Sequence, residues 1–197
     1  MAITDVDRDE IFLLFALTES ARAIAQFDQV HRLGQVREQV APGVERREMM
    51  SIFDSLRLAL HFAGSVSRIF WPPAGNDLAL ARGKRLRDAV GLPERHRLKD
   101  RALRNHVEHI DERLDQWTAC SPRPFTTVEM ILYDDTHLQT RRQALASTAV
   151  IYDITQDAII HFGDTFVLSD LRLALEDVQK HIGENLSSAH RAMSWVL

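Results

Sequence analysis

Apolar residues along much of the chain recur at steps of three and four, which places them on one side of an α-helix. The clearest case follows Pro42-Gly43 and ends before Trp71-Pro72-Pro73, because proline disfavours a helical residue before it. Its apolar stripe consists of Ile52, Leu56, Ala59, Ala63, Val66 and Phe70. The pattern predicts a helix from Arg47 to Phe70.

The N-terminal part predicts another helix, from Asp7 to about His31. Asp7 followed by Glu10 resembles a capping box, and acidic residues suit the first turn of a helix. The stripe expected to face the core consists of Ile11, Leu14, Phe15, Thr18, Ala21 and Ala25.

Two further helices have clear end signals. Asp77 is a suitable N-cap for a helix from Leu78 to Val90, and Gly91 is its expected stop. Ser169 precedes a helix that we expect to reach Ala189. Its inward residues are Leu171, Leu175, Val178, Ile182 and Leu186.

The segment from Arg97 to Trp117 contains no Pro or Gly and predicts a long helix. One side carries an apolar stripe that we expect to be buried, formed by Leu103, Val107, Ile110, Leu114 and Trp117. At about 100° per residue, the other side carries a polar cluster. That cluster consists of Arg101, Arg104, Asn105, Glu108, His109 and Glu112.

After the break at Ser121 to Phe125 the hydrophobic period changes. Val128 to Tyr133 is a weak strand candidate, and Thr148 to Ile154 and Ala158 to Phe162 are rich in β-branched and aromatic residues. A short hairpin is expected between the last two, and Thr165 to Val167 adds a further short segment. No strand is expected before residue 120.

These elements predict a mainly α fold in a single domain over residues 1–197. Residues 1–120 form an antiparallel helical bundle, residues 125–167 a small β-hairpin region, and residues 168–197 a C-terminal helix.

Composition restricts the classes of protein. The chain is 45% hydrophobic and 26% charged, as in ordinary globular proteins, and no run approaches the roughly 18 apolar residues of a membrane span. The first ten residues are acidic where a signal peptide is basic and then apolar. With a single cysteine, Cys120, no internal disulfide framework exists, so we expect a cytoplasmic protein without a membrane partner.

Charge is distributed unevenly around a net value of −4. Residues 82–104 carry nine Lys/Arg against three acids, and residues 105–115 carry four acids against one Arg. One interpretation is a solvated surface with internal ion pairs, and the other is a local field that attracts phosphate.

Arg104 and His109 suggest chemistry on such a phosphate. They lie about 140° apart around a helix, so one helix does not bring both to a single phosphate. Two such helices across a twofold axis would supply an Arg and a His to a shared cleft. Histidine exchanges a proton near neutral pH, and arginine is a fixed cation that fits phosphate, so the pair suits attack of a ribose 2′-hydroxyl without metal.

The pattern Arg104-Asn105, three residues, then His109 on a long helix resembles the motif of HEPN domains, and the likeness covers roughly the first 120 residues as architecture. The resemblance implies a homodimer, metal-independent RNA cleavage without a cofactor, and a role as a toxin or defence effector. It also implies a nucleotidyltransferase-type antitoxin as a partner. In members modified by that partner, a Tyr stands two residues after the motif His; here Asp111 does, so nucleotidylation at this position is not expected.

Within this hypothesis each polar residue has a role. Arg104 holds the phosphate, His109 is the general base or acid, and Asn105 orients His109. Glu108 lies four residues after Arg104 and positions it, with Arg101 as a further supporting cation.

Two alternatives remain. In the first, the polar face belongs to a non-catalytic dimer or partner-binding module. In the second, a metal lies between helices, held by His106, His109, Glu108 and Asp111 with help from Asp28, His31, Asp134 and His137. The second is the weaker, because no second inward pair of a carboxylate and a histidine is evident.

Overall fold

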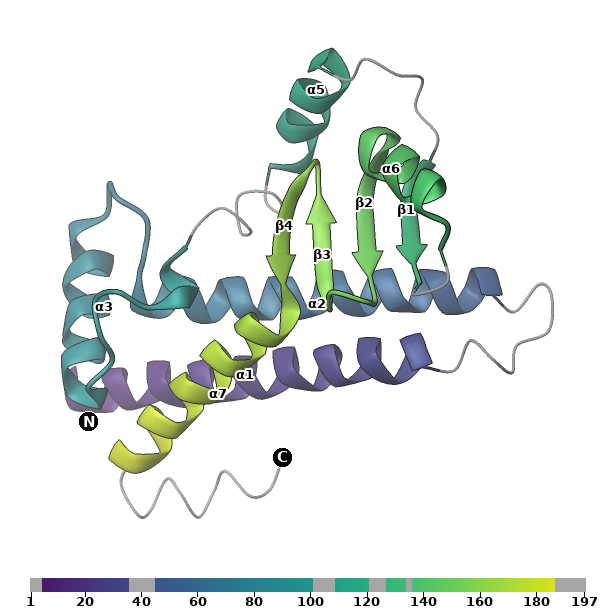
Figure 1. The fold of residues 1–197 in the computed structure, drawn as a ribbon. Helices are drawn as coiled ribbons and strands as arrows, with labels where there is room; N and C mark the ends of the chain where they lie inside the picture. Colours follow the sequence, from purple (N-terminus) through teal and green to yellow (C-terminus); the bar gives the residue numbers. More distant parts are fainter. Residues whose placement is uncertain (1–4, 36–44, 101–108, 121–126, 134–135, 187–197) are drawn as a thin grey trace. The chain divides into compact units, whose positions relative to one another are not determined.

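The computed structural model describes residues 5–35, 45–100, 109–120, 127–133 and 136–186. They form a mainly helical protein with one small sheet (Figure 1). The helices are α1 (Asp5–Gln35), α2 (Glu45–Phe70), α3 (Asp77–Val90), the 3₁₀ turn η2 (Arg97–Lys99), α5 (Ile110–Cys120), α6 (Leu138–Ser147) and α7 (Leu168–Asn185). The strands are β1 (Thr127–Leu132), β2 (Thr148–Asp153), β3 (Ala158–His161) and β4 (Asp164–Val167).

The chain divides into two compact units that alternate along the sequence. Among the described residues, the first unit contains 5–25, 59–100 and 171–186, and the second contains 26–35, 45–58, 109–120, 127–133 and 136–170. The organisation of residues 1–197 as a single domain stays a prediction.

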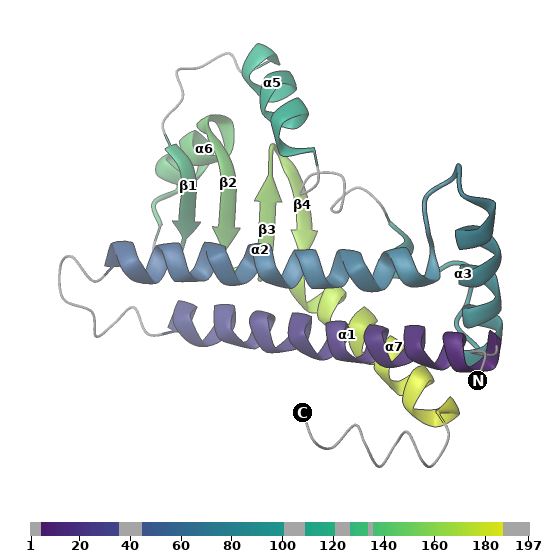
Figure 2. The same ribbon diagram turned by 180° about the vertical axis from the view of Figure 1, so that it is seen from behind.

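The helix expected from Arg47 to Phe70 is confirmed as α2. All six residues of its expected stripe are buried, and the helix ends at Phe70, directly before Trp71-Pro72-Pro73. α2 is drawn as one continuous helix in both views (Figures 1 and 2).

For α1 the helix is confirmed, but the predicted buried face is wrong. Ile11 is 58% exposed and Phe15 51% exposed, and Ala21 and Ala25 are exposed too. The buried stripe lies on the other side, at steps of three and four: Leu13, Ala16, Ser20, Ala23, Phe27 and Val30. It contains a serine and two alanines, so hydrophobicity alone favours the wrong side of the helix.

The helices α3 and α7 are confirmed, but their start signals differ from the prediction. α7 begins at Leu168 and ends at Asn185, so Ser169 lies inside the helix and is not its N-cap. Asn76 rather than Asp77 caps α3, its side chain accepting from Ala79 N, and Gly91 ends the helix at a left-handed φ of 72°. In α7 the expected inward residues Leu175, Val178 and Ile182 are buried, while Leu171 is half-buried.

The prediction of one helix from Arg97 to Trp117 is wrong at its start. Arg97–Lys99 is a 3₁₀ turn, and Asp100 is extended, with a ψ of 122°. The carbonyl of Leu98 accepts a hydrogen bond from the Ser67 hydroxyl instead of entering an α-helical ladder. Leu98 itself is buried, so a tertiary contact overrides the helical pattern here.

The sheet is larger than the predicted hairpin. Its order is β1-β2-β3-β4, with β2, β3 and β4 antiparallel and β1 parallel to β2. Two parallel neighbours need a crossover connection, and α6 supplies it. β2 and β3 are buried along their whole length, and Leu132, Ala144, Ile151 and Ile160 form a core cluster.

α6 was not predicted from the sequence. Leu138 and Leu145 on this helix are 60% and 44% exposed, and the residues it buries are Ala144 and Ser147. A helix that buries only small side chains has no visible apolar period. The described residues contain no strand before Thr127, as expected.

Candidate functional site

Most of the predicted catalytic motif lies outside the described residues. This applies to Arg101, Arg104, Asn105 and Glu108, and also to His106 of the metal alternative. His109 and Asp111 are described, and both are exposed.

His109 stands directly before α5. Its carbonyl accepts a hydrogen bond from Arg113 N, the first of that helix, at 3.0 Å. Its ring Nδ1 lies 3.9 Å from Glu112 Oε1, and 56% of the side chain is exposed. The imidazole is therefore accessible to a ligand from solvent, with the Glu112 carboxylate nearby.

Three residues of the apolar stripe expected to be buried on this helix are described, and Leu103 and Val107 lie outside the described residues. Ile110 is 49% and Leu114 41% exposed, whereas Trp117 is half-buried with its ring 6.1 Å from that of Phe162. Two apolar side chains near His109 are thus free to contact another surface.

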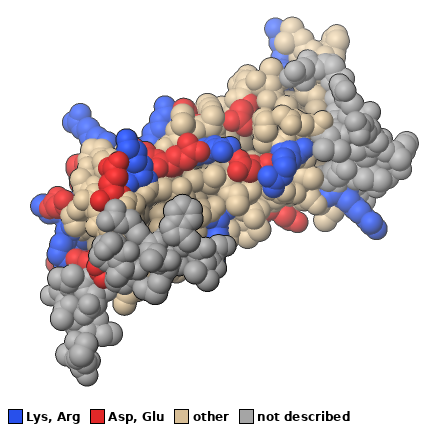
Figure 3. Space-filling model, turned by 90° about the horizontal axis from the view of Figure 1, so that it is seen from below, with Lys and Arg blue, Asp and Glu red and all other residues tan. Residues whose placement is uncertain are grey.

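Four cations of the basic block before the motif form ion pairs with nearby carboxylates. Lys84 pairs with Asp88 at 2.6 Å, and Arg85 donates two hydrogen bonds to Asp9, at 2.6 and 2.7 Å. On the face drawn in Figure 3, basic and acidic side chains lie beside one another.

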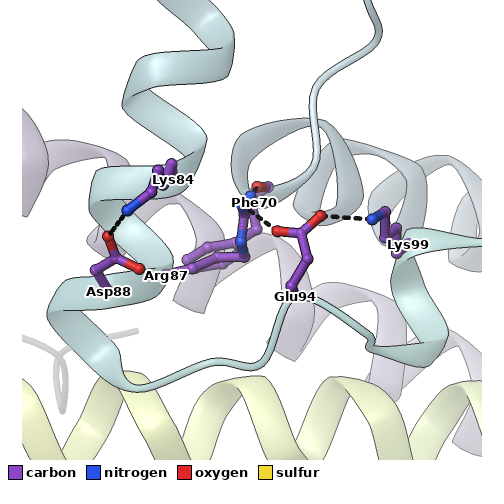
Figure 4. A network of polar contacts seen from close by, with 6 residues as sticks. All are labelled: Phe70, Lys84, Arg87, Asp88, Glu94 and Lys99. Carbon is purple, nitrogen blue, oxygen red and sulfur yellow. Dashed lines mark hydrogen bonds and ion pairs between the residues drawn. The ribbon is translucent and has the colours of Figure 1, made fainter.

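Glu94 joins two more of these cations, as Figure 4 shows: its carboxylate lies between Arg87 and Lys99. The hydrogen bond from Lys99 and the charge of both cations lower the pKa of Glu94. Arg87 also donates to the Phe70 carbonyl at the end of α2. These contacts favour a surface with internal ion pairs over a field that attracts phosphate.

A histidine cluster in the first unit was not found from the sequence. The His96 ring stacks on Trp71, with centroids 4.9 Å apart and planes 9° apart. Its Nδ1 accepts from Leu98 N at 3.2 Å, so Nε2 carries the proton and faces Asp177 Oδ2 at 3.3 Å. Burial lowers the pKa of His96, and Asp177 acts in the opposite direction.

His181 completes this cluster. Its Nδ1 donates to the Val90 carbonyl at 2.8 Å, and its Nε2 lies 3.8 Å from Asp177 Oδ1. The residues come from α7 and from the segment around η2, more than eighty positions apart, so sequence spacing carries no signal for them. Because His96 already uses both ring nitrogens in hydrogen bonds, the cluster is a structural link between these elements.

The residues proposed for a metal do not gather where the structure describes them. His31 shares a hydrogen bond with Gln35 along α1, and the ring of His137 caps α6 by accepting from Gln139 N. Within the described ranges no group of three or more His, Cys, Asp or Glu side chains is placed to hold a metal ion. Asp134 lies outside them.

Comparisons of the chain with protein-family models, with curated proteins and with solved structures find no match. None of the helices in the described part of the chain is both long and apolar enough to span a membrane.

Proposed function

We propose that the protein is a HEPN-like homodimer that cleaves RNA without a metal, with His109 as the proton-transfer group. The observation that carries the proposal is the exposed imidazole of His109 at the start of α5, beside two uncovered apolar side chains. A second copy docked on Ile110 and Leu114 would place two His109 side chains near one twofold axis.

The chemistry needs a base for the ribose 2′-hydroxyl and an acid for the leaving 5′-oxygen. Two histidines of a dimer supply both roles, and Arg104 neutralises the charge that develops on the phosphate. Asn105 orients the imidazole, and Glu108 and Arg101 support Arg104. The products are a 2′,3′-cyclic phosphate and a free 5′-hydroxyl.

The first prediction is that His109→Asn lowers RNA cleavage by about 10²- to 10⁴-fold, the usual loss when an acid–base group is removed. Folding should be unaffected, because the side chain is exposed. Arg104→Lys should cause a similar loss, because an ammonium does not replace a two-pronged guanidinium. Cleavage is measured on labelled RNA by gel, with cyclic-phosphate ends identified by mass spectrometry.

His137→Asn is the matched control, since His137 is also an exposed histidine at the start of a helix, α6. Its cleavage rate should equal that of the wild type, and EDTA should change neither. Full activity in the His109→Asn protein would refute the assignment. Activity lost on chelation would favour the metal alternative.

A second candidate function is a non-catalytic module that binds itself or a partner through α5. The exposure of Ile110 and Leu114 favours it independently of His109. If pure protein leaves RNA intact while Leu114→Glu lowers its mass in sedimentation, this function replaces the first. A toxin or defence role with a nucleotidyltransferase-type antitoxin belongs to the first candidate only.

A further inference from the structure

α1 carries a second apolar stripe, on the side opposite its buried one. Ile11 and Phe15 are more than half exposed, and Ala21 and Ala25 continue the same side of the helix. These positions belong to the first unit, in which the stripe Leu13, Ala16, Ser20 and Ala23 already fills the inward side. A helix with apolar residues on both sides is typical of one that packs on two neighbours.

Two polar residues of the outward stripe make contacts within the first unit. The Thr18 hydroxyl donates to the Leu14 carbonyl of its own helix at 2.9 Å. The Arg22 side chain is 58% exposed, with Nη1 3.0 Å from Glu19 Oε1 and its guanidinium 5.9 Å from the centre of the Phe62 ring. Apart from Arg22, the surface between Ile11 and Ala25 offers mainly hydrocarbon to a neighbour.

We propose that this stripe pairs with the same stripe of a second copy, antiparallel, about a twofold axis at Thr18. Such an axis brings together residues at equal distances on either side of it. Ile11 and Ala25 lie seven positions from Thr18, and Phe15 and Ala21 lie three positions from it. Each large side chain therefore meets an alanine, as close packing of two helices requires.

Charge complementarity supports the same axis. Arg8 and Asp28 each lie ten positions from Thr18, so Arg8 of one copy faces Asp28 of the other at both ends of the pair. A parallel arrangement would instead place Phe15 against Phe15 and Arg8 against Arg8. Of these two arrangements, the antiparallel pair satisfies both size and charge. Arg8 and Asp28 also have contacts within their own chain, which the pairing between copies would supplement.

This contact goes beyond the proposed function, because it uses α1 and neither α5 nor any residue of the Arg104–His109 motif. It holds whether or not the protein cleaves RNA. The contact is tested by which introduced cysteines form a disulfide between two copies. This measurement does not depend on whether RNA is cleaved.

The test introduces one thiol at a time into the Cys120→Ser protein. Thr18→Cys should form a disulfide-linked dimer under mild oxidation, because the twofold axis places the two thiols together. Ala25→Cys should not, since fourteen positions of helix, about 21 Å, separate the two thiols. A mixture of Ile11→Cys and Ala25→Cys proteins should give the mixed dimer.

Two further variants test the packing itself. Phe15→Glu in the Thr18→Cys protein should abolish the cross-link without changing the circular dichroism spectrum, because Phe15 is half-exposed. Arg8→Asp should weaken the dimer about two- to fivefold, and adding Asp28→Arg should restore it. Equal cross-linking of Thr18→Cys and Ala25→Cys, or none in any variant, would overturn the proposal, as would cross-linking that persists with Phe15→Glu.

Discussion

At the scale of single residues, His96 is a buried titratable group held on both sides of its ring. Only 7% of its side chain is exposed, and both ring nitrogens have partners, the Leu98 amide and Asp177. A proton added to Nδ1 would face the Leu98 N–H, and the charge would lie in a largely dry site against Trp71. The neutral ring is therefore part of the folded structure.

The pH dependence of stability follows from this burial. Because burial lowers the pKa of His96 below its ordinary 6.5, the unfolded chain binds this proton more tightly than the folded chain. The contribution of His96 is complete above about pH 6.5 and is lost as the pH falls towards the folded pKa, by at most about 1.4 kcal/mol per pH unit. We expect His96→Phe to reduce the change in the free energy of unfolding with pH, measured by urea unfolding between pH 7.5 and 5. The control variant His61→Phe, at an exposed position, should leave that change as in the wild type. Identical slopes for wild type and His96→Phe would contradict the assignment.

At the scale of elements, the crossover helix α6 is tied to the sheet by one ion pair. Arg141 donates to Asp153 at the end of β2, to the Tyr133 carbonyl and to the Thr155 hydroxyl. The Asp153 side chain is 1% exposed and accepts one further bond, from Gln156 N. A buried carboxylate of this kind depends on its cationic partner, which is Arg141 among the described residues.

Removing that partner should therefore be costly. Arg141→Met should lower the free energy of unfolding by about 3–5 kcal/mol, because Asp153 would stay buried without its cationic partner. Adding Asp153→Leu should recover much of the loss. Arg142→Met, at the exposed neighbouring position, should change stability by less than about 0.5 kcal/mol. Urea unfolding measures the stability of all three variants. Equal effects of Arg141→Met and Arg142→Met would show that the ion pair between Arg141 and Asp153 contributes little to stability.

At the scale of the whole molecule, charge is balanced locally. The chain carries a net −4, and within residues 82–100 ion pairs engage Lys84, Arg85, Arg87 and Lys99. Cations held by neighbouring carboxylates release few counterions from a nucleic acid, because their charge is already compensated. Recognition of RNA would then depend on a few residues at the site.

Salt dependence tests this balance. If the protein binds RNA, the logarithm of its association constant for RNA should fall only weakly with the logarithm of the salt concentration. The expected slope is about −1 to −2, which corresponds to one or two phosphate contacts per site. Fluorescence anisotropy with a labelled, uncleavable RNA between 50 and 200 mM salt measures it. A slope steeper than about −5 would show that the basic block engages the RNA backbone after all.

Some of this protein was determined by its sequence alone. The strong period of α2, the break at Trp71-Pro72-Pro73, the Gly91 stop and the inward face of α7 all depend on interactions within a few residues, so local pattern was sufficient. For the candidate site, the sequence named the motif, and the described structure adds the exposure of His109.

Tertiary structure decided the rest. The inward side of α1 includes Ala16 and Ser20, both fully buried, and the hydrophobicity of these small residues does not predict that burial. The turn at Arg97–Lys99 depends on Ser67 and His96, and the parallel pairing of β1 depends on a helix that buries only small side chains. These three features depend on contacts between residues far apart in the sequence. The free energy of such contacts outweighs the weak local preference of each segment for helix or strand.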